Sequence, residues 1–330
     1  MKIDPKLNPR LYELRVEQEA LRDGFGRGLV QAAEKNDQVV ALCADLSEST
    51  KVIDFAKKFP ERFIELGVAE QNMASVAAGM AVMGKIPFIT SYAIFSPGRN
   101  WEQIRTNICY NNVPVKIVGS HAGLNVGPDG GSHQMLEDLA LTRVLPRLTV
   151  VAPADALEAE RATLAAAKWD GPVYLRLARE KSPVLTTEDS PFKIGEAKVL
   201  LRPAKPDMAI IACGLMVYRS LLAARKLERE GIAATVINNH TIKPLDEETL
   251  MDEAVAAGAV VTAEEHQQIG GLGSAVAEML ARRRPLPQEF VAVADRFGQS
   301  GTPAELMEHY GLGVDDIVEA VKRVIGRKRN

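Results

Sequence analysis

SHAGLNVGPDGGSHQ occupies residues 120–134 and directly follows the run Val115–Val118, which predicts a buried strand. Its four glycines allow the backbone to turn sharply and to approach a ligand closely. His121, Asp129 and His133 supply proton donors and acceptors just past a strand end, where open α/β sheets bind ligands. A surface turn with incidental histidines is the alternative, but this density of polar groups after a strand favours a functional site.

Around this stretch, short runs rich in valine and isoleucine alternate with amphipathic segments. The predicted strands are Gln38–Cys43, Arg62–Leu66, Ile86–Thr90, Val115–Val118, Leu148–Val151 and Val173–Leu177. The predicted helices are Val68–Val82, Asn100–Tyr110 and Asp155–Lys168. This alternation predicts a parallel sheet that helices cover on both faces.

The pattern is interrupted over Lys181–Asp207, where proline, threonine, serine and charged residues predict a linker with one edge hairpin. A second series of alternating elements follows. Its predicted strands are Met208–Ala212, Ala233–Ile237 and Val260–Glu264, and its predicted helices are Met216–Glu230, Glu247–Ala257, Gly273–Arg283, Pro303–Gly311 and Val314–Ile325. The 330 residues are therefore predicted to form an α/β protein of two doubly wound domains, residues 1–190 and 191–330.

The composition restricts the class of protein. Hydrophobic residues make up 46% of the chain and the formal net charge is −3, which favours a globular protein without a nucleic-acid or membrane surface. No apolar run has the length of a membrane span, and the N-terminal residues lack the apolar core of a signal peptide. Cys43, Cys109 and Cys213 form no CxxC pair, which predicts buried, reduced thiols and a cytoplasmic protein.

A carboxylate stands where GVAEQNM (residues 67–73) joins a strand to a helix. Glu70 lies in the first predicted helical turn, where the helix dipole alone would explain a carboxylate. Its neighbours Val68 and Met73 are apolar, and the small residues that follow predict tight, dry packing. A partly desolvated carboxylate is easier to protonate, so Glu70 is a candidate for exchanging a proton with a buried ligand.

Further side chains follow other predicted strands. Tyr92 and Phe95 come after Ile86–Thr90 and can stack on a planar ring, although core packing would also explain them. Asp45 and Ser49 follow the first strand, where they could merely cap a helix. Arg179 follows the last strand of the first series, where a solvated arginine is the alternative. Because carboxyl ends of parallel strands meet at one sheet edge, we expect these groups to converge there.

Two other chemistries find little support. Ile269–Ser274 (IGGLGS) is similar to a dinucleotide-binding loop, but Val276 stands where the third glycine of G-x-G-x-x-G belongs. We therefore interpret this run as a tight turn from strand to helix. The five histidines show no metal-binding spacing, so we expect no metal held by this chain alone.

Four motifs make the chain resemble the C-terminal half of transketolase over nearly its whole length. They are ADLSES (44–49), GVAEQNM (67–73), TSYAIF (90–95) and, most specific, HAGLNVGPDGGSHQ (121–134). IKPLD (242–246) and TAEEHQQIGGLGSAV (262–276) resemble the C-terminal domain that transketolase shares with 1-deoxyxylulose-5-phosphate synthase. The resemblance implies a pyrimidine-binding domain of a thiamine diphosphate enzyme, followed by a transketolase C-terminal domain.

The resemblance also implies roles around the cofactor, thiamine diphosphate. Glu70 is implied to activate it by hydrogen bonding to N1′ of its aminopyrimidine ring. Phe95 and Tyr92 are implied to line that ring, and Asp45 to lie near the cofactor. His133 is implied to assist proton transfer.

Substrate-binding roles are implied for a second group of residues. His121 and Asp129 are implied to contact sugar hydroxyls or phosphate. Arg179 and Ser49 are implied to bind a sugar phosphate, with Arg22 a further candidate. The chemistry is suitable, because an arginine binds phosphate through charge-assisted, bidentate hydrogen bonds. The reaction implied is transfer of a two-carbon ketol unit from a ketose to an aldose, as in the pentose phosphate pathway.

The chain departs from the family at two points. Gly98 stands where many transketolases carry an aromatic residue, which predicts a thinner stacking wall. The GDG…N motif, which holds Mg²⁺ and the cofactor diphosphate in the N-terminal half of transketolases, has no counterpart in this sequence. We therefore expect a partner, an N-terminal transketolase subunit that holds the diphosphate and Mg²⁺, in an α2β2 assembly.

Two alternatives stay open. The beta subunit of a 2-oxo acid dehydrogenase E1 component has a similar length and domain order. Subunits of that class have a different loop at the place of Asp129–His133, however. A non-catalytic regulatory homologue is the other alternative. The presence of Glu70 together with the glycine loop argues against it.

Overall fold

The first of two large sheets contains seven strands within residues 2–328, the part of the chain that the computed structural model describes. Its order is β13-β7-β8-β6-β5-β3-β4, and every neighbouring pair is parallel except β13 with β7. The strands are β3 (Val39–Cys43), β4 (Phe63–Glu65), β5 (Ile86–Tyr92), β6 (Lys116–Ser120), β7 (Thr149–Val151), β8 (Val173–Arg176) and β13 (Thr241–Lys243). Because β4 and β5 flank β3 on opposite sides, a topological switch point lies there.

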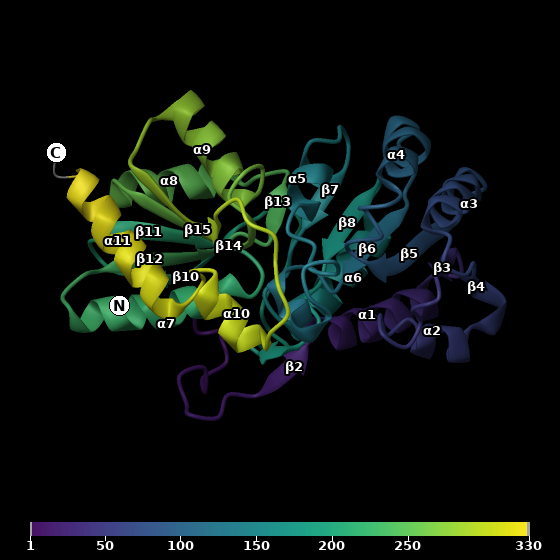
Figure 1. Cartoon of the computed structure of the whole chain (residues 1–330), viewed down its shortest axis with the longest axis horizontal. Helices are drawn as coiled ribbons and strands as arrows, with labels where there is room; N and C mark the ends of the chain where they lie inside the picture. The colour runs from purple at the N-terminus through teal and green to yellow at the C-terminus, as the bar shows by residue number, and fades with distance from the viewer. Residues whose placement is uncertain (1, 329–330) are drawn as a thin grey trace.

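Helices cover both faces of this sheet (Figure 1). They are α1 (Leu21–Lys35), α2 (Ile53–Lys58), η1 (Pro60–Arg62), α3 (Glu70–Val82), α4 (Trp101–Gln103), the π-helical η2 (Ile104–Tyr110), α5 (Asp138–Arg143) and α6 (Ala156–Lys168). The fully buried β3 shows how the layers form, because successive side chains of a strand point to opposite faces. Val39 and Ala41 pack with α1, α2 and α6, while Val40 and Leu42 pack with α3 and η2.

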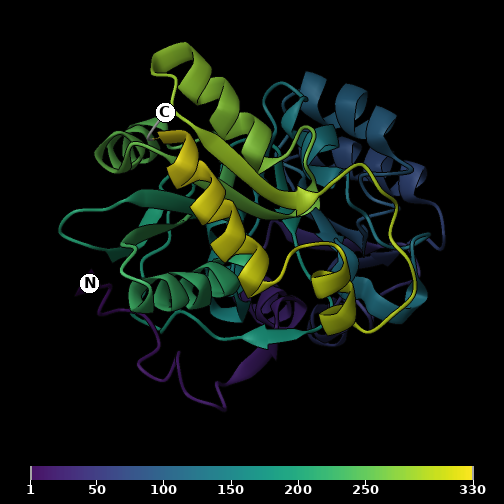
Figure 2. The ribbon, with the colours of Figure 1, turned by 60° about the vertical axis from the view of Figure 1, so that its left-hand side comes forward.

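The second sheet has the order β1-β10-β12-β11-β14-β15. These strands are β1 (Lys2–Ile3), β10 (Lys198–Arg202), β11 (Met208–Ala212), β12 (Ala234–Asn238), β14 (Val260–Gln267) and β15 (Gln288–Val293). The helices of this unit are α7 (Met216–Arg229), α8 (Glu247–Ala257), α9 (Leu272–Arg283), α10 (Pro303–His309) and α11 (Val314–Lys328). Core contacts place α7 and α11 on one face and α8 and α9 on the other (Figure 2), so the predicted α/β fold is confirmed.

The two sheets exchange edge strands. The N-terminal β1 pairs antiparallel with β10 of the second sheet, where Ile3 lies opposite Leu201. In the other direction, β13 leaves the second unit and pairs antiparallel with β7 of the first sheet. A separate antiparallel pair, β2 (Gln18–Ala20) with β9 (Lys181–Pro183), lies between them. The division at residues 190 and 191 stays a prediction, and these exchanges show that chain segments cross it in both directions.

Helix α1 is missing from the elements predicted from sequence, because Gly24, Gly26 and Gly28 lower the helix propensity of this segment. The structure gives the reason for two of these glycines. A Cβ atom on Gly24 would lie 1.9 Å from the carbonyl oxygen of Ala156, and one on Gly28 would lie 2.7 Å from that of Glu160. The glycines therefore allow α1 to pack closely against α6.

The predicted edge hairpin within Lys181–Asp207 is wrong. Strand β9 pairs with β2 and strand β10 pairs with β12, so the two strands of this segment belong to different sheets. Of the run Ile269–Ser274, which the sequence predicts as a tight turn from strand to helix, residues 269–271 form the turn after β14, and Leu272–Ser274 already belong to α9. The three cysteines are free and buried, as predicted. Within residues 2–328, none of the helices has the length and apolarity that a membrane crossing requires.

Candidate active site

Glu70 begins helix α3 at the carboxyl edge of the first sheet. The turn before it is held by Glu65 at the end of β4, whose Oε1 accepts from the backbone N–H of Gly67 at 2.9 Å. Gly67 has a φ of +64°, which favours glycine there. The Glu70 side chain is 1% exposed, and its Oε2 accepts from Nη1 of Arg99 at 2.8 Å. Its Oε1 is buried and has no hydrogen-bond partner among residues 2–328.

The segment after β5 closes over Glu70. Asn100 donates from Nδ2 to the carbonyl oxygen of Glu70 at 3.1 Å, and the Arg99 guanidinium lies 4.8 Å from the ring centroid of Phe95. Neither Arg99 nor Asn100 is among the residues predicted from sequence. A weak signal existed for Arg99, which stands four residues after Phe95 at the end of the aromatic motif.

Four of the predicted residues form a continuous row of rings. The His121 ring stacks on Tyr92 with centroids 3.8 Å apart and planes 18° apart. Tyr92 stacks on Phe95 at 6.1 Å, and Phe95 meets His133 edge-on at 5.7 Å. Two of these rings come from the end of β5 and two from the glycine loop. The structure therefore joins two motifs that are about 30 residues apart in sequence.

His121 is held neutral within this row. Its backbone has a φ of +56°, and Nδ1 lies 2.9 Å from Oγ of Ser120. Burial, reinforced by the positive charges of Arg22 and Arg179 and by His133, lowers the pKa of His121 to about 3. The imidazole is therefore uncharged at neutral pH and lies beside two arginines that attract anions.

The predicted substrate-binding residues Arg22 and Arg179 both lie close enough to His121 to act on its charge. Arg179 donates from Nη1 to the carbonyl oxygen of Val126 at 2.6 Å, and the same nitrogen lies 3.8 Å from Oδ1 of Asp129. Arg22 donates from Nη1 to the backbone oxygen of Ser49 at 2.9 Å, and its Nε is buried without a partner among residues 2–328. This group therefore keeps an unsatisfied donor next to its positive charges.

Asp45 stands apart from these clusters. Its side chain is exposed, its backbone has a φ of +59°, and its N–H donates to Oε1 of Glu65 at 2.8 Å. No hydrogen bond or ion pair within residues 2–328 joins the Asp45 carboxylate to the ring row or to Arg179. The β3–β4 edge thus places Asp45 near the start of α3 without fixing its side chain.

Gly98, where the sequence predicts a thinner stacking wall, is required by the local backbone. A Cβ atom built there would lie 2.0 Å from the carbonyl oxygen of Ile94, so this backbone admits only glycine. Over residues 2–328, no group of three His, Cys, Asp or Glu side chains is arranged to hold a metal ion.

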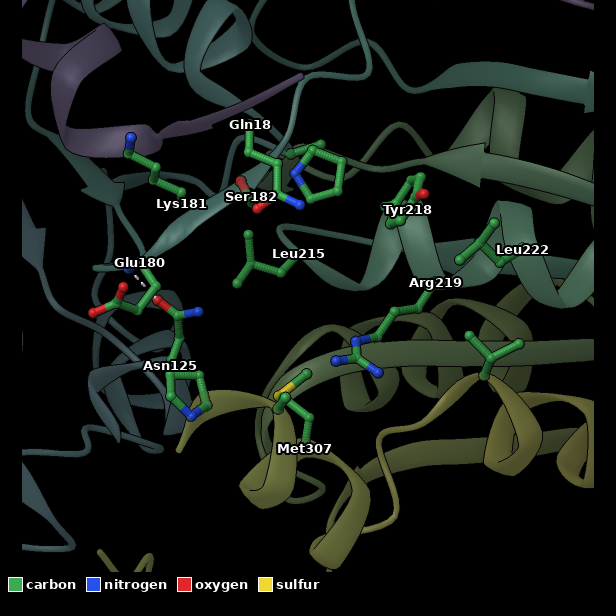
Figure 3. A pocket seen from close by; sticks show the side chains of 15 residues that line it. Gln18, Asn125, Glu180, Lys181, Ser182, Leu215, Tyr218, Arg219, Leu222 and Met307 are labelled. Carbon is green, nitrogen blue, oxygen red and sulfur yellow. Dashed lines mark hydrogen bonds between the residues drawn. The ribbon is translucent and has the colours of Figure 1, made fainter. Parts of the chain in front are cut away.

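A cavity of about 410 Å³ lies between the two units but away from the predicted residues (Figure 3). Its lining includes Asn125, Glu180, Tyr218, Arg219 and Met307. Glu180 and Asn125 are joined there by a hydrogen bond from the backbone N–H of Glu180 to Oδ1 of Asn125 at 2.6 Å. The cavity therefore touches the back of the glycine loop, not the ring row.

Two family models match the chain. The transketolase pyrimidine-binding domain matches residues 17–184, and the transketolase C-terminal domain matches residues 195–317. Among solved structures, a chain described as "Split gene transketolase, inactive beta4 tetramer" shares 48% identity and a TM-score of 0.88, covering 94% of this chain and 99% of that one. The transketolase of Campylobacter jejuni, at 23% identity and a TM-score of 0.79, supports the fold alone.

Curated relatives fall into two length classes. The 6-deoxy-6-sulfo-D-fructose transketolase subunit SqwH of Clostridium sp. (strain MSTE9) is 42% identical over 96% of this chain and 98% of its own length. A chain from Methanocaldococcus jannaschii, described as a transketolase C-terminal section, is 42% identical over 91% of this chain and 95% of its own. Human transketolase is 35% identical over 93% of this chain but only 49% of its own length. The chain thus spans about half of a full-length relative.

Proposed function

The chain belongs to the transketolase family, and we propose from this that it is the C-terminal subunit of a thiamine-diphosphate-dependent transketolase, in which it helps to transfer a two-carbon ketol unit from a ketose to an aldose. Both family models match, and together they account for most of its length. The family as a whole depends on thiamine diphosphate.

The observation that carries the proposal is the state of Glu70. Its carboxylate is buried, Arg99 fixes one oxygen, and the other oxygen has no partner within residues 2–328. A buried acceptor without a partner costs about 1–3 kcal/mol, so its retention favours a ligand that supplies a donor. The aminopyrimidine of thiamine diphosphate fits this requirement, because a protonated ring nitrogen can donate to that oxygen.

Each cluster of this chain then has a defined task. When bound, thiamine diphosphate supplies the electron sink for breaking the carbon–carbon bond. Glu70 would exchange a proton with the aminopyrimidine at its free oxygen, while the rings of Tyr92 and Phe95 provide a flat, water-excluding wall. His133, edge-on to Phe95, is positioned to move a proton on the substrate side.

The group around His121 fits the substrate. His121, as an uncharged imidazole, can form a hydrogen bond with a sugar, and the Asp129 carboxylate can accept from sugar hydroxyl groups. Arg179 and Arg22, with Ser49 beside them, form a positive region suited to the phosphate of a sugar phosphate. We assign Asp45, at the exposed end of β3, to the neighbourhood of the cofactor.

The remaining part of the proposal concerns the partner. The chain covers 98% of one transketolase subunit but 49% of human transketolase, which supports a separate N-terminal subunit holding the diphosphate and Mg²⁺. We propose an α2β2 assembly of the two subunits in the cytoplasm. The cytoplasmic part rests on the three free, buried cysteines.

The test is reconstitution of activity. The purified chain is assayed with thiamine diphosphate, Mg²⁺, a ketose phosphate and an aldose phosphate, with and without an N-terminal transketolase subunit that carries GDG…N. We expect ketol transfer only from the mixture. Turnover by the homogeneous chain alone would overturn the split-enzyme proposal, and a mixture that assembles without turnover would favour a regulatory homologue.

A further inference from the structure

Two consecutive glutamates at the end of β14 are buried on opposite sides of the second sheet. Glu264 is 1% exposed and Glu265 is 2% exposed. Glu264 accepts from the backbone N–H groups of Leu272 and Gly273, both at 2.7 Å, and so caps α9 within its own unit. Glu265 points the other way and reaches the first unit, because neighbouring residues of a strand face opposite sides.

Glu265 contacts the glycine loop where its 3-10 turn, η3 (Leu124–Asp129), begins. Oε1 of Glu265 accepts from the backbone N–H of Asn125 at 2.7 Å. The carboxylate also lies directly against Gly123, where an added Cβ would be 2.6 Å from the carboxyl carbon. Gly123 has a φ of +82°, so this glycine meets both a backbone and a packing requirement.

The backbone of Glu265 is anchored from the first sheet. Arg176, at the end of β8, donates from Nη2 to the carbonyl oxygen of Glu265 at 2.7 Å. Its Nε donates to Oδ2 of Asp138 at 2.9 Å, and the Tyr174 hydroxyl donates to the same oxygen at 2.8 Å. Glu265 is therefore held at both its main chain and its side chain by residues of the first unit.

The loop that Glu265 holds leads directly to the proposed sugar-binding residues. The Asn125 side chain accepts from the backbone N–H of Glu180 at 2.6 Å (Figure 3). The residue before Glu180 is Arg179, which donates to Val126 within η3, and Asp129 ends the same turn. Hydrogen bonds and short stretches of backbone thus link the Glu265 carboxylate to Arg179, and the backbone of η3 links it to Asp129.

We propose that Glu265 is a positioning residue through which the C-terminal domain fixes η3, and with it the spacing of Arg179 and Asp129 around the sugar. The expected effect on catalysis rests on the proposed function, whereas the contact between Glu265 and η3 is independent of it. The two glutamates then have parallel structural tasks. Glu264 caps a helix of its own domain, while Glu265 caps a turn of the other.

The charges around Glu265 add a pH dependence. Burial raises the pKa of Glu265 to about 7, although Arg176, the Asn125 N–H and Arg219 favour the carboxylate; Asp138 acts in the same direction as burial. Below pH 7 the group is mostly protonated and is a weaker acceptor for the Asn125 N–H. We therefore expect the KM for the sugar to fall as pH rises through about 7.

The first test needs no activity and uses the full chain. Amide hydrogen exchange is measured for the wild type and for Glu265→Ala, Glu265→Gln and Glu264→Ala. We expect the amides of η3 to exchange about tenfold faster or more in Glu265→Ala, as loss of a charge-assisted hydrogen bond implies. Glu265→Gln keeps an acceptor oxygen and should retain most of the protection. Glu264→Ala should expose the start of α9 and leave η3 unchanged.

The second test uses the assembled enzyme. Glu265→Ala should raise the KM for a phosphorylated ketose about tenfold with a much smaller change in kcat. Glu265→Gln should restore most of the affinity and abolish the change of KM near pH 7. Unchanged exchange in η3, or equal loosening of η3 by Glu264→Ala, would overturn the positioning role. If the assembly has no activity, the proposed function fails while the exchange result still decides this inference.

Discussion

The two ends of the candidate site differ in how far the chain's own residues satisfy them. At the glycine-loop end, His121 is stacked on Tyr92 and bonded to Ser120, and Arg179 has a carbonyl and two carboxylates as neighbours. At the α3 end, Glu70 keeps a buried oxygen without a partner within residues 2–328. Within the described part of the chain, the loop end leaves a donor, Nε of Arg22, without a partner, whereas the α3 end leaves an acceptor that awaits a donor from elsewhere.

The outer surface of α3 agrees with this difference. Val82 is 70% exposed and Met83 is 82% exposed at the far end of the helix, and Val68 is 67% exposed just before it. These apolar side chains, exposed before α3 and at its far end, are available for contact with another surface. Under the proposed function, proton chemistry belongs to the α3 end, where the cofactor would supply the missing donor, and substrate recognition belongs to the glycine-loop end.

The largest expected effect is at the α3 end. Glu70→Gln should reduce turnover of the assembled enzyme by about 10²–10⁴, because an amide cannot exchange the proton that a carboxylate can. The fold should persist, since Gln can still bond to Arg99. Steady-state kinetics and circular dichroism measure the two quantities. The exposed Glu61→Gln is the matched control. Retention of more than about a tenth of wild-type turnover by Glu70→Gln would contradict the role of Glu70.

A smaller effect is expected at the glycine-loop end. Arg179→Ala should lower kcat/KM for phosphorylated sugars about 10- to 150-fold, as loss of a charge-assisted bond of roughly 1.5–3 kcal/mol implies. Dephosphorylated analogues should be affected much less. Measuring kcat/KM for a phosphorylated sugar and for its dephosphorylated analogue distinguishes phosphate recognition by Arg179 from a purely structural role. An equal loss on both substrates would mean that Arg179 only anchors Val126, and the exposed Lys181→Ala should change neither.

The burial of His121 predicts a pH dependence of stability. The pKa values of His121 and His240 are lowered from 6.5 to about 3 in the folded chain. Between these values the unfolded chain binds protons that the folded chain does not. The free energy of unfolding should therefore fall on acidification below pH 6.5, by up to about 1.4 kcal/mol per pH unit for each histidine. Denaturant unfolding at several pH values gives the dependence of the free energy of unfolding on pH. This dependence should be weaker for His121→Asn than for the wild type and unchanged for the exposed His309→Asn.

The smallest expected effect tests whether the α3 surface is uncovered in the isolated chain. A Cβ atom on Gly79 would meet no atom within 4 Å, so Gly79→Ala should stabilise the chain by about 0.5–1 kcal/mol through helix propensity. Gly24→Ala, where the new atom would lie 1.9 Å from a carbonyl oxygen, should destabilise it. Denaturant midpoints compare the two variants. A loss of stability in Gly79→Ala would show that this face is already covered.

Much of the fold could be predicted because its strands are continuous apolar runs. Strands β3, β5, β6 and β11 lie within or beside the predicted ranges, since burial on both faces leaves a local signal. The short strands β1 and β13 have no such local signal in the sequence. Their partners lie about 200 and 90 residues away in the chain, and no local pattern specifies such pairing.

Contacts between distant segments could not be predicted in the candidate site either. Residues inside one motif, such as His121 and Asp129, could be proposed together because the motif itself supplies the spacing. The contact of Arg99 with Glu70 joins two motifs, and that of Glu265 with Asn125 joins two domains. Neither residue type is unusual where it stands, so only the folded chain identifies these contacts.

The exchange of edge strands has a consequence for how this gene can be divided. A cut in the linker between residues 184 and 195 would leave β7 without β13 and β10 without β1. Each fragment would then present a row of unpaired N–H and C=O groups, which recruits strands from other chains and promotes aggregation. During translation, likewise, β7 stays open until residue 243 has emerged from the ribosome. A viable gene split within this chain would therefore have to carry β1 and β13 along with their partners.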